Sequence, residues 1–219
     1  MFSYLTPNTF IEILCFLFAI VCLTTDKNAV WRSMILYLLF TCIAEIAGIY
    51  FGRKTHNNNW IYNIFLVIEA CFTNLMFVSL FNKYHKSKLM VIPGLALFAI
   101  FYVQGLMNHG FFVYNNFTYT FMSVLYVMYS LYYYYLLITD DRFINLKSSP
   151  EFWWTAGTLF FYFANTVCNL FDEKLEEVMV TSTRNLSYVI FAGLNIILYT
   201  CWSYSFICRK WQTKMLKIS

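Results

Sequence analysis

Long apolar runs limit what this chain can fold into. Stretches of about twenty predominantly apolar residues occur at about 8–25, 30–51, 60–81, 88–106, 117–138, 152–171 and 186–207. A helix needs ~20 such residues to cross the hydrocarbon core of a bilayer. Short polar segments, including "TTDKN" and "GRKTHNNN", separate the runs. The pattern predicts seven membrane-spanning helices joined by short loops.

The scarcity of charge supports the same fold class. Only 12% of the 219 residues are charged and 60% are apolar, whereas an ordinary soluble domain carries about 25% charged residues. Barrel strands of ~9–11 strictly alternating residues are absent. We therefore expect an all-α, polytopic seven-helix bundle that forms one membrane domain over residues 1–219, with the lipid bilayer of the cell membrane as its solvent.

The basic residues predict how the bundle is oriented. Eleven fall on one side of the expected spans: Lys27, Arg32, Lys83, Lys86, Lys88, Arg142, Lys147, Arg209, Lys210, Lys214 and Lys217. Four fall on the other: Arg53, Lys54, Lys174 and Arg184. Because cytoplasmic loops carry the excess of Lys and Arg, the N-terminus is expected outside and the C-terminus in the cytoplasm. Aromatic residues near the run ends are expected to anchor in the membrane interfaces, namely Trp60, Trp153, Trp154, Trp202 and the tyrosines at 132–135.

Two glutamates inside the apolar runs are the sharpest functional signal. Glu45 lies six residues before the end of the second run, and Glu69 lies nine residues into the third. A charged side chain at the bilayer centre costs about 2.5–3.5 kcal/mol on insertion scales. Both carboxyls should therefore face the bundle interior, paired or protonated. Because a short loop joins their helices, the two side chains are candidates to share one site.

Other embedded polar residues also lie toward the outer half of the expected bundle. We take the following as candidates to line an outward-facing ligand pocket with the two glutamates: Asn63, Gln104, Tyr119, Asn165 and Asn195. Interhelical hydrogen bonding is the alternative role for amides such as Asn63 and Asn195. Glu12, near the outer end of the first run, is expected among the lipid headgroups.

Several kinds of chemistry have no residues to carry them. The seventh run contains no lysine, which excludes a retinal Schiff base of the microbial-rhodopsin kind at its usual place. All three histidines fall in loops, and the seven cysteines form no C-x-x-C pair. We therefore predict no metal site, no cofactor and no catalytic residue. Nucleic acid is not an expected partner, because no Lys/Arg stripe lies free of the membrane.

Three stretches carry a family resemblance: "YLLFTCIAEIAGIYFG", "NNNWIYNIFLVIEACF" and "SPEFWWTAGTLFFYFAN". Together they resemble a group of small bacterial multi-pass membrane proteins with six or seven helices, without an assigned activity. The matching positions are Glu45, Asn63, Glu69, Pro150, Phe152 and Trp153. In size and apolar make-up the chain is also similar to membrane accessory proteins of CRISPR and other phage-defence systems. The resemblance implies a polytopic fold and names no substrate.

Three functional hypotheses follow. The first is a non-enzymatic receptor-like or sensor-like protein that binds a small or cationic ligand from outside and meets anionic lipid or a cytoplasmic protein partner through its basic loops and tail. The second is a homo-oligomeric pore or a membrane accessory protein. The third is an intramembrane enzyme or proton-coupled transporter that uses the same two glutamates. The sequence leaves all three open.

Overall fold

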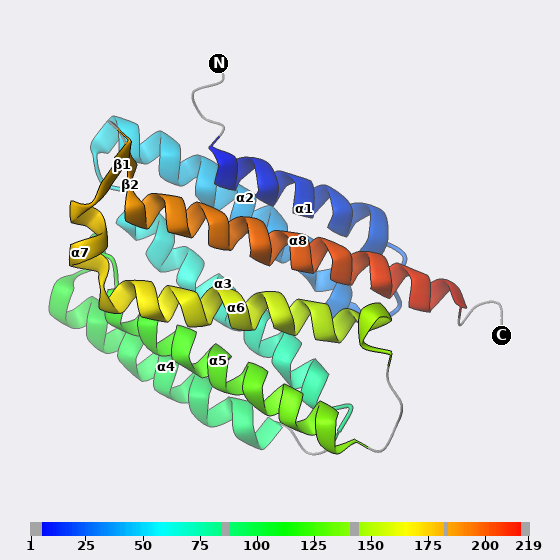
Figure 1. Cartoon of the computed structure of the whole chain (residues 1–219). Coiled ribbons are helices and arrows are strands. Elements are labelled where there is room, and N and C mark those ends of the chain that lie inside the picture. Colours follow the sequence, from blue (N-terminus) through cyan, green and yellow to red (C-terminus); the bar gives the residue numbers. More distant parts are fainter. Residues whose placement is uncertain (1–5, 85–87, 141–144, 182–183, 216–219) are drawn as a thin grey trace.

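A computed structural model describes residues 6–84, 88–140, 145–181 and 184–215. The described chain is helical apart from one short antiparallel hairpin (Figure 1). Its elements, in order, are α1 (Pro7–Leu23), α2 (Ala29–Thr55), α3 (Asn59–Phe81), α4 (Lys88–His109), α5 (Asn116–Thr139), η2 (Leu146–Ser148), α6 (Pro150–Leu170), α7 (Asp172–Glu177), β1 (Met179–Thr181), β2 (Arg184–Asn185) and α8 (Leu186–Met215). Each of the seven expected apolar runs thus forms one helix. The ends differ by up to four residues, except that α8 continues eight residues beyond its expected run.

Local capping explains where several helices begin and end. The side chain of Asn28 accepts backbone N–H groups at the start of α2, and Ser149 does so at the start of α6. These bonds satisfy donors that the first turn of a helix leaves free. Pro150 occupies the first position of α6, as the sequence predicted, because its missing N–H is not needed there. His56 ends α2 in a left-handed conformation (φ 56°).

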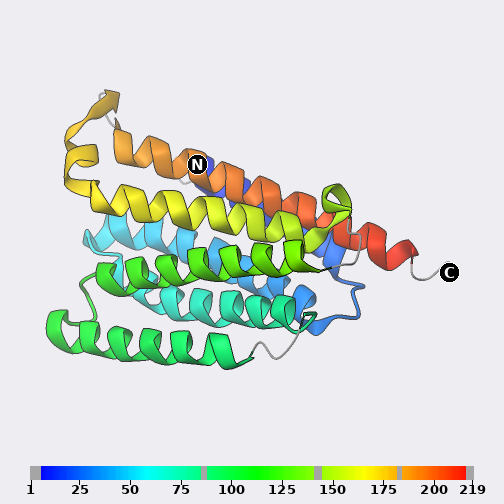
Figure 2. The same cartoon turned by 60° about the horizontal axis from the view of Figure 1, so that its bottom comes forward.

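The helices form a ring with one helix outside it. Around the ring, neighbouring helices contact one another in the order α1, α2, α3, α5, α6 and α8, and α8 closes the ring against α1. Helix α4 packs outside, against α3 and α5 (Figures 1 and 2). We call the end that carries β1 and β2 the hairpin end, and the opposite end, where α8 finishes, the tail end (Figure 1).

Most of the long helices have the length and apolarity of membrane spans. Within the described residues, five meet both conditions: α2, α3, α4 from Met90, α5 and α8. Helix α1 is equally apolar in character but has only 17 residues. Helix α6 has 21 residues and a more polar sequence, because it carries buried residues such as Thr155, Thr158 and Asn165 on its inward face. By the length and apolarity of its helices, the fold is compatible with a helical membrane protein.

Helices α6 and α8 pack tightly against each other along a contact that we call the α6–α8 seam. Two tryptophans in this seam do not have the role that the sequence predicted. Trp154 and Trp202 stack with ring centroids 5.7 Å apart and are 0% and 1% exposed. The Nε1 of Trp202 donates to the backbone oxygen of Trp154 and to Oγ1 of Thr158, both at 3.2 Å. Interfacial anchoring was therefore the wrong role for these two tryptophans. Their rings are buried because both helices turn them inward across the same seam.

Gly157 allows this seam to close, which gives a testable prediction. A Cβ added to Gly157 would lie 2.8 Å from Cβ of Cys201 and 3.2 Å from the backbone oxygen of Leu198, whereas a Cβ on Gly193 would meet nothing within 4 Å. We expect Gly157→Ala to lower the free energy of unfolding by about 1–3 kcal/mol through overpacking. The matched Gly193→Ala should be neutral or raise it by up to ~1 kcal/mol. Denaturant titration in detergent micelles measures both; equal effects would contradict the prediction.

Candidate functional site

A cavity of about 210 Å³ lies inside the helical ring. Tyr114, in the loop between α4 and α5, is one of its lining residues, so the cavity reaches the hairpin end of the bundle. The described lining comprises Glu12, Tyr37, Thr41, Ala44, Glu45, Tyr62, Phe65, Leu66, Glu69, Tyr114, Tyr119, Phe161, Tyr162, Asn195, Leu198 and Tyr199. Acidic and aromatic side chains therefore dominate its wall.

Helical spacing explains why these residues meet. On α2, Tyr37, Thr41 and Glu45 follow one another at intervals of four residues. On α3, Tyr62, Phe65, Leu66 and Glu69 recur at intervals of three and four residues. Residues so spaced lie on one face of a helix. The two helices turn these faces toward the ring interior, so Glu45 and Glu69 line the same cavity.

Three carboxyl groups line this cavity, and their partners differ. Tyr62 Oη donates to Oε2 of Glu45 at 3.4 Å. Tyr162 Oη donates to Oε1 of Glu69, which is 8% exposed. Glu12 is 6% exposed, and its buried Oε2 has no hydrogen-bond partner among the described residues.

The position of Glu12 corrects the expectation that it lies among the headgroups. Its helix is seated against both α2 and α8, and that packing turns the carboxyl inward. None of the described residues that line the cavity is lysine, arginine or histidine. The three acids therefore share the cavity without a cationic side chain from the described wall.

The other predicted pocket residues divide into two groups. Tyr119 and Asn195 line the cavity. Asn63 and Asn165 are fully buried but are not among its lining residues, and Asn165 Nδ2 donates to Oγ of Ser123 at 3.2 Å. Gln104 is exposed on α4, the helix outside the ring, and does not line the cavity.

Asn63 holds the loop that carries Tyr114. Its Nδ2 donates to the backbone oxygens of Phe111 at 2.9 Å and Val113 at 2.8 Å. Its Oδ1 accepts the backbone N–H of Asn115 at 3.1 Å. The amide therefore uses both donors and its acceptor on one loop. In this arrangement Asn63 positions a wall of the cavity and does not face it.

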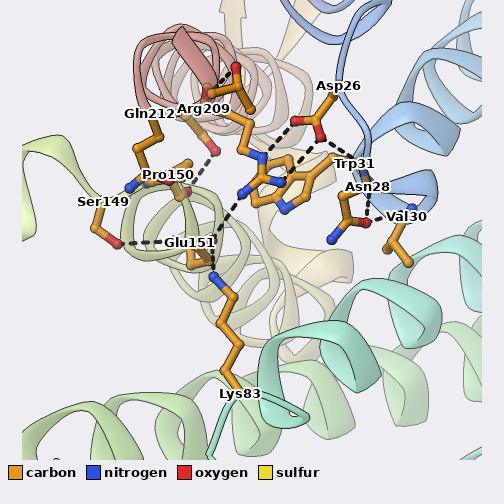
Figure 3. Close-up of polar contacts among 12 residues, drawn as sticks. Asp26, Asn28, Val30, Trp31, Lys83, Ser149, Pro150, Glu151, Arg209 and Gln212 are labelled. Carbon is orange, nitrogen blue, oxygen red and sulfur yellow. Dashed lines mark hydrogen bonds and ion pairs between the residues drawn. The ribbon is translucent and has the colours of Figure 1, made fainter. Parts of the chain in front are cut away.

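A second polar cluster lies at the tail end (Figure 3). Arg209 on α8 donates from Nε to Oδ2 of Asp26 at 2.6 Å and from Nη2 to Oδ1 at 3.2 Å. Its Nη1 lies 4.0 Å from Oε1 of Glu151 on α6, and Lys83 also forms an ion pair with that oxygen. The Arg209 guanidinium lies 5.4 Å from the ring centroid of Trp31. We call Asp26, Lys83, Glu151 and Arg209 the tail-end ion cluster.

The tail-end ion cluster joins parts of the chain that are far apart in sequence. Asp26 belongs to the α1–α2 connection, Glu151 begins α6, and Arg209 lies on α8. Asp26 and Glu151 are 4% and 6% exposed, although both belong to polar segments between the apolar runs of the sequence. Arg209 and Lys83, expected to contact lipid or a partner, are engaged here. Lys86, Arg142 and Lys217 lie outside the described residues.

The sequence alone does not predict this cluster. Asp26 lies two residues before the helix cap Asn28, whose backbone N–H it accepts at 2.7 Å, and Glu151 falls in the first turn of α6. An acidic residue is common at either place because it stabilises the helix start. Neither signal predicts a partner in α8, since 183 positions separate Asp26 from Arg209.

The donor set favours no metal centre in the described part of the chain, where no three His, Cys, Asp or Glu side chains converge. Glu12, Glu45 and Glu69 thus surround the cavity and do not meet at one point. Comparisons with protein-family models, with curated proteins and with solved structures find no match. Any function for the cavity must therefore be argued from its own chemistry.

Proposed function

We propose that this chain is a receptor-like or sensor-like integral membrane protein that binds a small cationic ligand in the cavity. In this proposal seven helices span the cell membrane, the N-terminus and hairpin end face outward, and the tail end faces the cytoplasm. The ligand enters from outside. The distribution of Lys and Arg supports this orientation, because most of them fall at the tail end.

The observation that carries the proposal is the charge imbalance in the cavity. Three carboxyls line it, and no described lining residue is a cationic side chain. A carboxylate inside a membrane protein is costly unless it is paired or protonated. Six tyrosines also line the wall, and aromatic faces attract ammonium ions. Acidic and aromatic groups together make a site for a small cation.

Removing one carboxyl tests this proposal. We expect n-butylammonium chloride to raise the thermal unfolding midpoint of the wild-type protein in detergent, compared with sodium chloride at the same ionic strength. Glu69→Gln and Glu45→Gln should abolish most of that rise, because each removes a charge from the cavity. Glu177→Gln changes an exposed glutamate on α7 and should behave as wild type. An equal rise in all four proteins, or none in wild type, would contradict the proposal.

The tail-end ion cluster supports one alternative function, that of a transporter. A cavity that reaches one end of a bundle, with ion pairs joining helices at the other end, has the form of one state of an alternating-access carrier. In that case Glu45, Glu69 or both would move a cation or proton across the membrane. Flux of radiolabelled n-butylamine into proteoliposomes distinguishes the two functions, because a receptor binds the amine without transporting it.

A further inference from the structure

The unpartnered carboxyl of Glu12 indicates what kind of cation the cavity takes. Glu12 is more than nine-tenths buried, lines the cavity, and leaves Oε2 without a hydrogen-bond partner among the described residues. A buried acceptor without a donor costs about 1–3 kcal/mol, and more when it is charged. A ligand that donates hydrogen bonds to this oxygen would remove that cost.

Glu45 and Glu69 lie at two levels of the cavity. Glu12, on the neighbouring helix α1, lines the same cavity as Glu45. Helices α2 and α3 run antiparallel, with Gly48 against the ring of Tyr62 and Tyr37 against that of Phe72. This register places Glu69 beside Thr41, four residues from Glu45 along α2. At 1.5 Å per residue, the backbone position of Glu69 therefore lies about 6 Å farther from the hairpin end than that of Glu45.

The wall between these two levels suits a hydrocarbon chain. Phe65 and Leu66 lie on α3 about one turn nearer the hairpin end than Glu69, and Leu198 lines the cavity from α8. A volume of about 210 Å³ is below the ~300–1,000 Å³ of a pocket for drug-sized molecules. The small volume and the lining therefore favour a small aliphatic ligand with a charged group at each end.

We propose that the cavity binds a short linear aliphatic diamine, with one ammonium group held by Glu12 and Glu45 and the other by Glu69. The inference rests on the proposed function and specifies its ligand class. A doubly charged ligand places one cation at each level, whereas a monoamine leaves one level without a cation. A compact metal ion fits less well, because the acids do not converge on one point in the described structure.

Isothermal titration with matched amines tests the proposal on the wild-type protein. The probes are putrescine, n-butylamine, which has the same carbon chain and one amine, and ethylenediamine, whose amines are too close to reach both levels. We expect putrescine to bind at least about tenfold more tightly than either, because a second charge-assisted bond forms. Equal affinity for putrescine and n-butylamine would overturn the diamine proposal.

Glu12→Gln provides the second test. This variant should bring the affinity for putrescine to within about twofold of that for n-butylamine. The reason is that one carboxyl proposed to hold the ammonium group nearer the hairpin end loses its charge. Glu177→Gln should keep the wild-type preference. A preserved preference in Glu12→Gln would overturn the role of Glu12, and the wild-type amine series stands even if this variant fails to fold.

The amine series also separates the diamine proposal from the proposed function. If n-butylamine binds as tightly as putrescine and Glu69→Gln removes that binding, the cation site of the proposed function survives while the diamine proposal fails. If no amine binds, both fail.

Discussion

Arg209→Met is expected to lower the free energy of unfolding by about 3–5 kcal/mol, the usual result of removing one partner of a buried ion pair. The loss arises because Asp26, 4% exposed, stays buried without the two hydrogen bonds that Arg209 donates. Methionine retains much of the apolar stem, so packing changes less than charge. Denaturant titration in detergent micelles measures the difference.

Two further variants separate the ion pair from other effects. Lys210→Met removes the neighbouring exposed cation, whose Nζ donates to the backbone oxygen of Val21, and should cost less than ~1 kcal/mol. Asp26→Asn combined with Arg209→Met should recover part of the loss, because no unpaired charge stays buried. If Arg209→Met and Lys210→Met cost the same, the tail-end ion cluster does not hold the helices together.

Asn63→Ala is expected to destabilise the fold by about 3 kcal/mol, since the side chain makes three hydrogen bonds of ~1 kcal/mol each. It should also weaken amine binding about tenfold or more, because the freed loop carries Tyr114 out of the cavity wall. Thermal unfolding and titration with putrescine measure the two effects. The binding loss is the part that a purely structural role far from the cavity would not produce.

Asn59→Ala is the matched control for Asn63→Ala. Asn59 lies one turn earlier on the same helix, is only half-buried, and donates a single long bond of 3.4 Å to the backbone oxygen of Phe112. Its replacement should cost less than ~1 kcal/mol and leave putrescine affinity unchanged. Loss of binding in both variants to the same extent would show that Asn63 has no special role in holding the loop.

Helix positions were predictable from the sequence because the bilayer imposes a local rule. A backbone in lipid must satisfy its own hydrogen bonds, so each run of about 20 apolar residues becomes a helix. Pro150 and the segment before it predicted the start of α6 for a similarly local reason. Pro93 lies inside α4, and the helix is continuous through it from Lys88.

The candidate site could be predicted only in part from the sequence. Glu45 and Glu69 stood out because a carboxyl is rare in an apolar run, and both line the cavity. The position of Glu12 was predicted wrongly, because its distance from the end of its apolar run placed it among the lipid headgroups. Gln104 was misplaced by the same counting, since α4 lies outside the ring and leaves this amide exposed.

The sequence by itself determined that the chain forms long apolar helices, and the approximate range of each, because those properties depend on neighbouring residues. Only the tertiary structure decided which side chains meet. It joined Asp26 to Arg209, turned Glu12 into the cavity that Glu45 also lines, and stacked Trp154 on Trp202. The direction in which a helix points a side chain becomes meaningful only when its neighbours in the ring are known.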